Sequence, residues 1–497
     1  MHFIELVARL AALGGGPTPG VFLVGGTVRD GLLGRPLADV DVAVAGDARE
    51  FGQRAAAALG GTYVPLGERF GACRIVLRGA ATSQHLDLVS YAGSIESDLR
   101  RRDFTVNAMA VAAHGFDGDW AAAEVLDPTG GRADLASKTL RMVAPTVLDD
   151  DPLRLLRAVR FVAELGFALD GATTTAVRDR AVTLASVAPE RVRAELCRVL
   201  AAEGAVAWIE LLDDLGLLDV LLPELTAGRG VEQPKEHHWD VFTHQVETVA
   251  TAEVLTTGVM SPRLGNRPYL LPALERRPQH PRLNGYFAQQ LGDQPRSTLV
   301  KLAALLHDVG KPATKTIEPS GRMRFFGHPE LGAQMVEERL HGLRFSQVET
   351  SAVCTMVGQH MRPAQWRDSG PPTQKALFKF FRDLGAVAID TIFLNLADHL
   401  GARGPSLNRE HWDDHVAWAE QVITWHYEQV RRVGAPRPVT GDDLMRAFGL
   451  RPGKRVGELL LAIDEARAAG VVASRDDALA LAAERLVTKG KPAATMG

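Results

Sequence analysis

The sequence predicts an α+β fold, with an N-terminal head built around a small mixed sheet and a mostly helical remainder. Short valine-rich runs bounded by glycine lie before about residue 145, as in VFLVGG (21–26) and DVDVAV (39–44). From about residue 150 the apolar residues recur at helical spacing instead. The chain has 497 residues, which is too long for one ordinary domain, so we expect several.

The expected elements and parts follow the chain in order. Strands are expected over 21–26, 39–44, 73–77 and 85–91. Helices are expected over 48–60, 150–167, 189–204 and 205–218. A segment rich in Pro, Arg and Asn (261–287) indicates a surface insertion in a second helical region. The predicted parts are a head (1–148), a helical neck and body (149–230), a second helical domain with an insertion near 256–297 (231–404) and a helical tail (405–497).

Composition excludes a globally basic or membrane-bound protein. The net charge is −4, so binding to nucleic acid must depend on local patches. The three cysteines are far apart and match no metal or redox spacing, which indicates buried thiols in a reducing compartment. The N-terminal stretch is too short and too interrupted by charge for a secretory or membrane signal. We therefore expect a cytoplasmic protein.

Two aspartates in the second expected strand indicate a metal site. Asp39 and Asp41 are two residues apart, so the alternation of a strand places both carboxylates on one face. Such a pair repels itself unless a cation is bound, and Mg²⁺ prefers carboxylates together with phosphate oxygens. Two such ions can activate an attacking hydroxyl and stabilise a leaving pyrophosphate. Asp87, on another expected strand, is the best candidate for a third carboxylate.

A Gly-Gly turn just ahead of these aspartates indicates phosphate binding. Gly25 and Gly26 let backbone N–H groups approach a triphosphate, and Arg29 can neutralise it. The alternative is a plain turn followed by a solvated aspartate pair. The combination of glycines, arginine and paired aspartates favours the phosphate site.

The stretch DDPLRLLRAVRF (150–161) carries a second set of charged residues. Asp150 and Asp151 are expected to open a helix, where capping alone would account for them. Arg154, Arg157 and Arg160 then recur every three residues and predict one cationic edge. An Asp accepts from an exocyclic amine and an Arg donates to ring acceptors, so an i, i+3 pair at the start of this helix can read the edge of a base.

Five stretches occur in an order and at distances that resemble the class II tRNA nucleotidyltransferases, the superfamily of CCA-adding enzymes and bacterial poly(A) polymerases. They are LVGGTVRDGLLGRPLADVDVAV, RRRDFTVNAMAV, GGRADL, DDPLRLLRAVRF and PERVRAEL. The resemblance covers about residues 20–225. It implies a nucleotidyltransferase head followed by helical neck and body domains, with the tRNA 3′ end, CTP and ATP as partners and no protein partner or membrane.

The resemblance also implies a role for each matching position. The catalytic Mg²⁺ ions would be bound by Asp39 and Asp41. The triphosphate would be held by Gly25, Gly26 and Arg29, and Arg102 would contact the nucleotide. CTP and ATP would be selected by Asp151 and Arg154, supported by Arg157 and Arg160. Asp87 is expected on geometric grounds alone.

Two stretches depart from the family pattern. The usual Glu-Asp opening of the base-reading helix is Asp150-Asp151 here, a mild change. Between Asp87 and Arg100 the chain has only LVSYAGSIESDL, where many family members carry a longer flexible segment that helps the switch from C to A addition. Shortened forms resemble the members that add only the two cytidines, which puts terminal A addition in question.

A histidine and aspartate set indicates a second metal site. An adjacent His307-Asp308 follows an apolar helix, and the set that accompanies it is His244, His328, His360 and Asp398. These side chains suit Mn, Fe, Ni, Zn or Mg, and Lys311 could hold a phosphate. The set resembles the HD phosphohydrolases, in an all-α domain over about 236–400, with all six residues as ligands. The alternative is a group of satisfied polar residues at helix ends. His237 and His238 are expected on a loop near the first helix instead.

The function that these observations predict is the addition of 3′-terminal C, C and A to tRNA from CTP and ATP, with a possible phosphohydrolase activity in the HD domain. That domain would trim 2′,3′-cyclic or 3′-phosphate ends before nucleotide addition. Alternatives in the same class are a CC-only enzyme and a poly(A) polymerase. Alternatives of other classes are an HD phosphohydrolase with an RNA-binding head and a non-catalytic RNA-binding protein, against which the aspartate pair argues.

Overall fold

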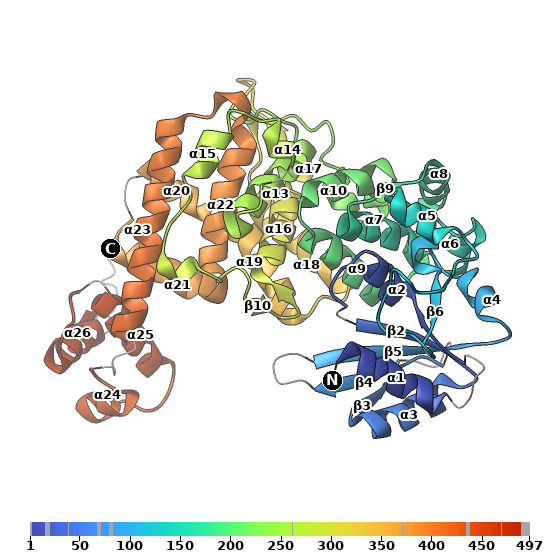
Figure 1. The fold of residues 1–497 in the computed structure, drawn as a ribbon. Helices are drawn as coiled ribbons and strands as arrows, with labels where there is room; N and C mark the ends of the chain where they lie inside the picture. The colour runs from blue at the N-terminus through green and yellow to red at the C-terminus, as the bar shows by residue number, and fades with distance from the viewer. Residues whose placement is uncertain are drawn as a thin grey trace. The chain divides into compact units, whose positions relative to one another are not determined.

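A computed structural model shows two compact units (Figure 1). It describes residues 2–14, 20–37, 39–66, 71–78, 83–260, 262–369, 372–433, 438–468 and 470–488. The first unit consists of Met1–Val199 and Leu211–Leu221, and the second of Leu200–Glu210 and Leu222–Gly497. The predicted α+β class is confirmed. The predicted division into four parts is finer than two units, and its limits stay a prediction.

The first unit contains a seven-stranded mixed sheet in the order β3-β4-β5-β2-β1-β6-β7. Within it β2 and β5 run parallel, whereas the other neighbouring strands are antiparallel. The strands are β1 (Val21–Val24), β2 (Asp39–Ala45), β3 (Thr62–Pro65), β4 (Cys73–Arg78), β5 (Ser83–Tyr91), β6 (Ala110–Ala112) and β7 (Val125–Leu126). The predicted strands over 39–44, 73–77 and 85–91 are therefore present within a residue or two of their expected ends.

Alternation along β2 separates a core face from a polar face. Val40, Val42 and Val44 are buried, and α3 (Ala48–Leu59) packs against β2, β3, β4 and β5. On the opposite face Ala43 joins an apolar cluster with Phe22 and with side chains of the short helix α4 (Ile95–Leu99). Asp39 and Asp41 share the face of Ala43 because they lie four and two residues from it.

The expected strand over 21–26 is two residues shorter than predicted. β1 ends at Val24, and Gly25 is the first residue of helix α2 (Gly25–Leu32). Gly25 has φ +59°, a left-handed value that a residue with a Cβ adopts at a cost, and this turn redirects the chain from the strand into the helix. The Gly-Gly pair therefore forms the start of a helix instead of the end of a strand.

Helices complete the first unit and continue into the second. The remaining helices up to residue 226 are α1 (Phe3–Leu13), α5 (Gly131–Ala136), α6 (Thr146–Asp150), α7 (Leu153–Leu165), α8 (Gly171–Arg180), α9 (Pro189–Ala201), α10 (Ala205–Asp214), α11 (Leu218–Leu221) and α12 (Pro223–Thr226). Short 3₁₀ turns lie at Thr105–Asn107 (η1) and Ala181–Ser186 (η2), and β8 (Thr139–Leu140) pairs with β9 (Ala168–Leu169). The predicted helix over 150–167 begins later, at Leu153, because Asp150 ends α6 and Pro152 caps α7.

The second unit is built around helices that pack on one another in the HD region. α13 (Val241–Thr257) packs against α16 (Arg296–Leu306) and α22 (Ala388–Arg403), and α18 (His328–Gly342) packs against α19 (Gln347–Gln359). Shorter elements there are α14 (Pro262–Gly265), α15 (Leu271–Glu275), η3 (Pro281–Leu283), α17 (Lys311–Thr314), α20 (Arg362–Ser369), α21 (Gln374–Leu384), η4 (Gly385–Val387) and η5 (Gly404–Ser406). Two small hairpins pair β10 (Gln290–Leu291) with β11 (Gln294–Pro295) and β12 (Thr316–Ile317) with β13 (Met323–Arg324).

The tail begins with one long helix and ends in a small bundle. α23 (Arg409–Val433) precedes α24 (Gly441–Phe448), α25 (Lys454–Ala468) and α26 (Arg475–Thr488), which share an apolar core of their own. Part of the predicted surface insertion, from α15 to about residue 280, is packed against α23. Trp412 of α23 donates its indole N–H to the backbone oxygens of Ala273 and Arg276, and Arg276 forms a two-pronged ion pair with Glu420.

Among the helices that the structure describes, no segment has both the length and the apolar character needed to cross a bilayer.

Candidate functional sites

The first candidate site lies on the polar face of the strand pair β2–β5. In the parallel register Asp41 lies opposite Asp87, and Asp39 lies opposite His85, with 3.3 Å between its Oδ1 and the histidine Nδ1. Residues directly opposite in neighbouring strands project from the same face. The structure thus brings together the three aspartates that the sequence singles out.

The Gly-Gly start of α2 lies directly against Asp41. The backbone N–H of Gly26 donates to Asp41 Oδ2 over 2.9 Å, and the hydroxyl of Thr27 accepts from the N–H of Asp41. A Cβ on Gly26 would come within 3.0 Å of Asp41 Oδ2, and one on Gly25 would come within 3.0 Å of Arg102 Nη1. The glycines therefore leave room for a carboxylate and a guanidinium at the helix start.

Arginines offset the negative charge of this site only in part. Burial raises the pKa of Asp41, Arg102 acts to lower it, and Asp87 raises it again. Asp87 itself accepts two hydrogen bonds of 2.7 Å from Arg74 on β4, and Arg102 donates to Asp98 over 3.1 Å. A raised pKa at a half-buried carboxylate that faces a second carboxylate indicates that the site favours a bound cation.

Arg29 is already engaged within the protein. Its Nε and Nη2 donate to Asp30, and its Nη1 donates to Asn107 over 2.7 Å. Its guanidinium also lies 5.4 Å from the ring centre of Phe161 on α7. Arg29 therefore ties α2 to η1 and α7, and its predicted contact with a triphosphate stays a prediction.

Asp151 and Arg154, the two residues expected to read a base, differ in whether an ion pair within the protein already engages their charge. Asp151 lies between α6 and α7, accepts the N–H of Leu153 and forms an ion pair with Arg191 over 2.8 Å. Arg154 donates to the backbone oxygen of Val147 and has no ion pair among the described residues. Arg154 is therefore the arginine of α7 with its charge still available to a ligand.

The predicted cationic edge on α7 is wrong, because two of its three arginines already form ion pairs with carboxylates inside the protein. Arg157 donates twice to Asp103, with distances of 2.9 and 2.6 Å, and Arg160 pairs with Glu195 and Glu164. Burial alone would raise the pKa of Asp103, yet Arg157 and further hydrogen bonds hold it at about 2. Arg157 and Arg160 thus anchor α7 to the RRRDF stretch and to α9.

The second candidate site gathers the six predicted ligands at the ends and faces of five helices. His244 lies on α13 and Asp398 on α22, whereas His307 and His360 follow the last residues of α16 and α19. His328 is the first residue of α18. The ligand atoms fall into overlapping groups, each with all its members within 4.8 Å of one another.

Asp308 lies at the centre of two of these groups. Its Oδ2 is 3.3 Å from His244 Nε2 and 3.1 Å from His307 Nε2. Its Oδ1 is 3.3 Å from His328 Nε2 and 3.7 Å from His360 Nε2. One carboxylate thus faces two histidine pairs, an arrangement that suits a carboxylate shared between two metal ions.

Backbone carbonyls orient three of these imidazole rings. The Nδ1 atoms of His307, His328 and His360 lie 2.9, 2.8 and 2.6 Å from the carbonyl oxygens three residues before them. Donation from Nδ1 to a carbonyl leaves the Nε2 lone pair free to coordinate a metal. Burial would lower the pKa of His307, but the carboxylates of Asp308 and Asp398 raise it to about 10, so this group attracts a cation.

His237 lies on the expected loop but is not remote from the second site. Its ring meets the ring of His244 edge to face at 5.1 Å, and it forms a ligand group with His244 and Asp398. Burial, with Lys311 next in size, lowers its pKa to about 3, so the ring is neutral and able to coordinate. A histidine pair on a loop has no helical spacing to connect it with the other ligands, so the sequence does not predict His237 as one of them.

A cavity of about 350 Å³ opens onto the second site. Lys311 contacts Asp308 and Gln233, each at 2.6 Å, and it lines the cavity with Arg324 and Arg403. Phe326 lines it too and is 74% exposed, with the guanidinium of Arg324 5.5 Å from its ring centre. The cavity therefore combines a candidate metal cluster with cations and an exposed aromatic ring.

Several residues of both sites carry no sequence signal. Arg74 alternates with buried residues in a strand, and only the register of β4 with β5 places it on Asp87. Glu195 meets Arg160 because α9 packs beside α7, and Gln233 meets Lys311 from a loop. Such partners become visible only when the fold brings distant segments together.

Comparisons with known proteins agree with this architecture. The family model described as "Poly A polymerase head domain" matches residues 21–141, "Probable RNA and SrmB-binding site of polymerase A" matches 166–228, and "HD domain" matches 277–403. The computed structure is similar to the Thermotoga maritima CCA-adding enzyme complexed with tRNA, with a TM-score of 0.56, 20% identity and coverage of 97% of this chain and 95% of the other. At that identity the likeness shows the fold.

Two curated relatives match along nearly their whole length. An A-adding tRNA nucleotidyltransferase of Deinococcus radiodurans is 37% identical over 93% of this chain and 94% of its own. A CC-adding tRNA nucleotidyltransferase of Thermus thermophilus is 34% identical over 92% of each chain.

Proposed function

We propose that this chain, which belongs to the tRNA nucleotidyltransferase family, adds the 3′-terminal C, C and A to tRNA from CTP and ATP. The observation that carries the proposal is the pair Asp41 and Asp87, opposite each other in parallel strands, with Asp41 held by the N–H of Gly26 beneath Arg102. A tRNA substrate is proposed because the relatives are tRNA nucleotidyltransferases by name.

Different residues of the head have different roles in nucleotidyl transfer. Asp39, Asp41 and Asp87 would hold two Mg²⁺ ions, which when bound supply charge neutralisation for the phosphates and the departing pyrophosphate. Arg102 lies beside Gly25 and Asp41, where it can donate to the triphosphate. Gly26 fixes the Asp41 carboxylate, so the geometry is set before substrate arrives.

Base selection is assigned to the start of α7. Asp151 would accept from the exocyclic amine that C and A share, and Arg154 would donate to a ring acceptor. Arg191 holds the Asp151 carboxylate from α9, which restricts its orientation. Arg157 and Arg160 support α7 through Asp103 and Glu195 and do not contact the base themselves.

A second candidate, addition of C and C only, is favoured by the segment between Asp87 and Arg100. β5 runs to Tyr91, and α4 starts at Ile95 with the Ser94 hydroxyl accepting the N–H of Ser97. Little chain is left between these elements for the flexible segment associated with the switch to A. The named activities of the relatives also divide between A addition and CC addition.

Sequencing the products made on a tRNA that ends at the discriminator base separates these candidates. The proposal predicts that the sequence CCA is added once when CTP and ATP are both present, and that only CC is added with CTP alone. Products that stop at CC with both nucleotides support the second candidate. Long A tails would indicate a poly(A) polymerase. Nucleotide addition would be refuted if none of three tRNAs, ending in the discriminator base, in C or in CC, were extended.

We further propose that the HD cluster hydrolyses phosphate esters at RNA ends, such as 2′,3′-cyclic or 3′-phosphates. His244, His307, Asp308, His328, His360 and Asp398 would hold two divalent ions, which when bound lower the pKa of coordinated water. Lys311 and Arg324 lie in the same cavity, where they can bind the phosphate of the substrate. The metal stays unspecified because imidazole and carboxylate suit several.

Hydrolysis of bis(p-nitrophenyl) phosphate and of RNA 3′-phosphate, measured with each of Mn²⁺, Ni²⁺, Mg²⁺ and Zn²⁺, tests this activity. His307→Ala is expected to abolish it and to leave CTP addition unchanged. An equal rate in the wild type and His307→Ala would refute hydrolysis by the HD cluster. We propose a cytoplasmic location as well, in keeping with the three cysteines, Cys73, Cys197 and Cys354, which form no disulfide among the described residues.

A further inference from the structure

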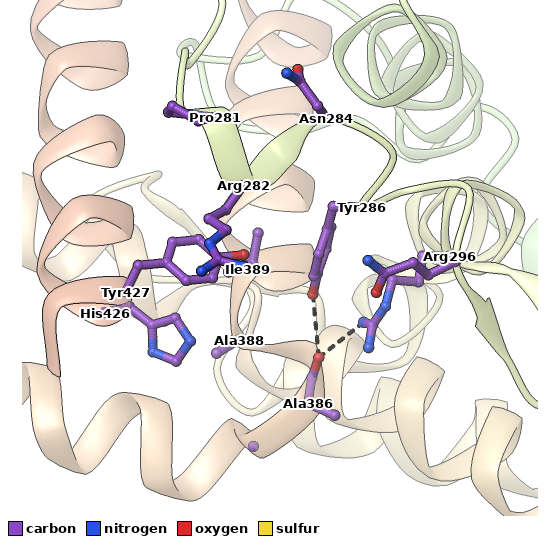
Figure 2. A pocket seen from close by; sticks show the side chains of 12 residues that line it. Pro281, Arg282, Asn284, Tyr286, Arg296, Ala386, Ala388, Ile389, His426 and Tyr427 are labelled. Atoms are coloured by element: carbon purple, nitrogen blue, oxygen red, sulfur yellow. Dashed lines mark hydrogen bonds between the residues drawn. The ribbon is translucent and has the colours of Figure 1, made fainter. Parts of the chain in front are cut away.

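A second cavity of about 510 Å³ lies in the second unit, and none of its lining residues belongs to the histidine cluster. Its walls come from η3 and the chain that follows it, from the start of α16, from η4 with the start of α22, and from α23 (Figure 2). The lining includes two arginines, Arg282 and Arg296, and no acidic residue. The Arg296 guanidinium is paired with the buried Asp390, so the positive charge that no described carboxylate compensates at this cavity is that of Arg282.

The floor of this cavity is a fixed hydrogen-bonded group. Arg296 donates from Nη1 to the backbone oxygen of Ala386 over 2.9 Å and to the buried Asp390 over 2.7 Å. Tyr286 donates its hydroxyl to Asp390 over 2.7 Å, and Figure 2 shows Tyr286 and Arg296 both directed at the oxygen of Ala386. The Arg296 side chain is about nine-tenths buried, and its Nε has no hydrogen-bond partner among the described residues. Arg296 thus retains an unused donor in a rigid position.

The opposite wall supplies a second, free cation and two aromatic rings. Arg282 is exposed and has no ion pair among the described residues. Figure 2 shows it beside Tyr427, whose ring stacks on His280 with 4.9 Å between centroids, while His426 stacks on Phe381 at 4.1 Å. Burial lowers the pKa of His426, so this imidazole is neutral at physiological pH. The wall is therefore held in place by stacking, with the positive charge of Arg282 left for a ligand.

We propose that this cavity is a phosphate-binding site, with Arg282 as the residue that contacts the phosphate and Arg296 as a second donor beneath it. Guanidinium groups present several donors in a plane, which matches phosphate oxygens better than any neutral side chain does. The packed segment 271–287, bound to α23 through Trp412 and Glu420, keeps Arg282 at the cavity. The phosphate can come from the backbone of a bound RNA or from a free phosphate.

Salt-dependent tRNA binding tests the RNA source, with Arg282→Ala compared with the wild type. One lost phosphate contact is expected to weaken binding of a tRNA without CCA on the order of tenfold at low salt. The slope of log affinity against log KCl concentration should fall by about one. Arg451→Ala, which removes another exposed arginine outside the cavity, is the matched control and should change neither quantity. Arg282→Lys should recover most of the slope.

A second measurement covers free phosphate and checks the integrity of the variants. The wild type and Arg451→Ala should show a higher Tm in inorganic phosphate than in chloride of equal ionic strength, and Arg282→Ala should lose that shift if the cavity binds free phosphate. CTP addition at saturating tRNA should be equal in all variants, since the head is untouched. If Arg282→Ala matches Arg451→Ala in tRNA affinity, in salt slope and in the phosphate shift, the proposal is refuted.

Discussion

The two candidate sites are built in opposite ways. In the head, the key groups come from one short stretch, since the Gly-Gly start of α2 and the Asp39/Asp41 strand lie within 17 residues of sequence, positions 25 to 41. In the HD region, the ligands run from His244 to Asp398 and come from separate helices. The head holds carboxylates that arginines offset only in part, whereas the HD cluster holds four histidines around two carboxylates.

This difference indicates which ligand each site needs in order to be completely assembled. The carboxylates of the head are partly compensated by Arg74 and Arg102, so a nucleotide that brings its own phosphates and metal completes the site. Five of the six predicted HD ligands are buried and backbone carbonyls already orient three of them, so the metal alone completes that site. Variants that affect one site and spare the other sharpen this comparison.

Asp41→Asn is expected to give the largest effect. Removing the charge that faces Asp87 takes away a metal ligand and should lower the rate of CTP addition on the order of a thousandfold. Hydrolysis of bis(p-nitrophenyl) phosphate should not change. Asp117→Asn, an exposed aspartate of the same unit, is the control. A wild-type rate of CTP addition by Asp41→Asn, measured with excess Mg²⁺, would remove this aspartate from the proposed site.

Gly26→Ala tests whether the helix start fixes the Asp41 carboxylate. The added Cβ would meet Asp41 Oδ2 at 3.0 Å, and a misplaced catalytic carboxylate should lower CTP addition on the order of a hundredfold. Gly171→Ala at the start of α8 is the matched control, because its Cβ would meet no atom within 4 Å. The Tm of both variants should stay close to the wild type. Equal kcat/KM in the two variants would show that Asp41 tolerates the contact.

Asp103→Asn tests the anchor between the RRRDF stretch and α7. Because the pKa of Asp103 is about 2 in the folded protein, its ionisation stabilises the fold by about 2 kcal/mol above the unfolded pKa near 4. That contribution is lost as the pH falls from about 4 to about 2. Urea unfolding should therefore show a stability loss for Asp103→Asn that is full at pH 7 and shrinks toward pH 3. A loss that does not depend on pH would contradict the ion pair with Arg157.

How much of each candidate site can be predicted from the sequence depends on whether its residues are related by a local pattern or only by the packing of distant segments. Alternation in β2 places Asp39 and Asp41 on one face and is a local pattern, whereas Asp87 joins them only through the pairing of β5 with β2. The edge of arginines on α7 was predicted wrongly, because spacing shows which residues share a face and not which carboxylates lie opposite. His237 carries no sequence signal for the same reason, since only the packing of its loop against α13 brings it to His244.

His237→Ala is the smallest expected change and the sharpest test of how the HD cluster is built. If the loop supplies a ligand, the affinity of the metal-free protein for Mn²⁺, measured by isothermal titration, should fall roughly tenfold. His238→Ala is the matched control, because its backbone N–H bonds to Ala402 and its ring lies at Gly404, away from the ligand groups. The head should be unaffected, so CTP addition in Mg²⁺ should be equal in both variants. Equal Mn²⁺ affinities in the two variants would mean that His237 only packs against His244 and that the six predicted residues form the whole ligand set.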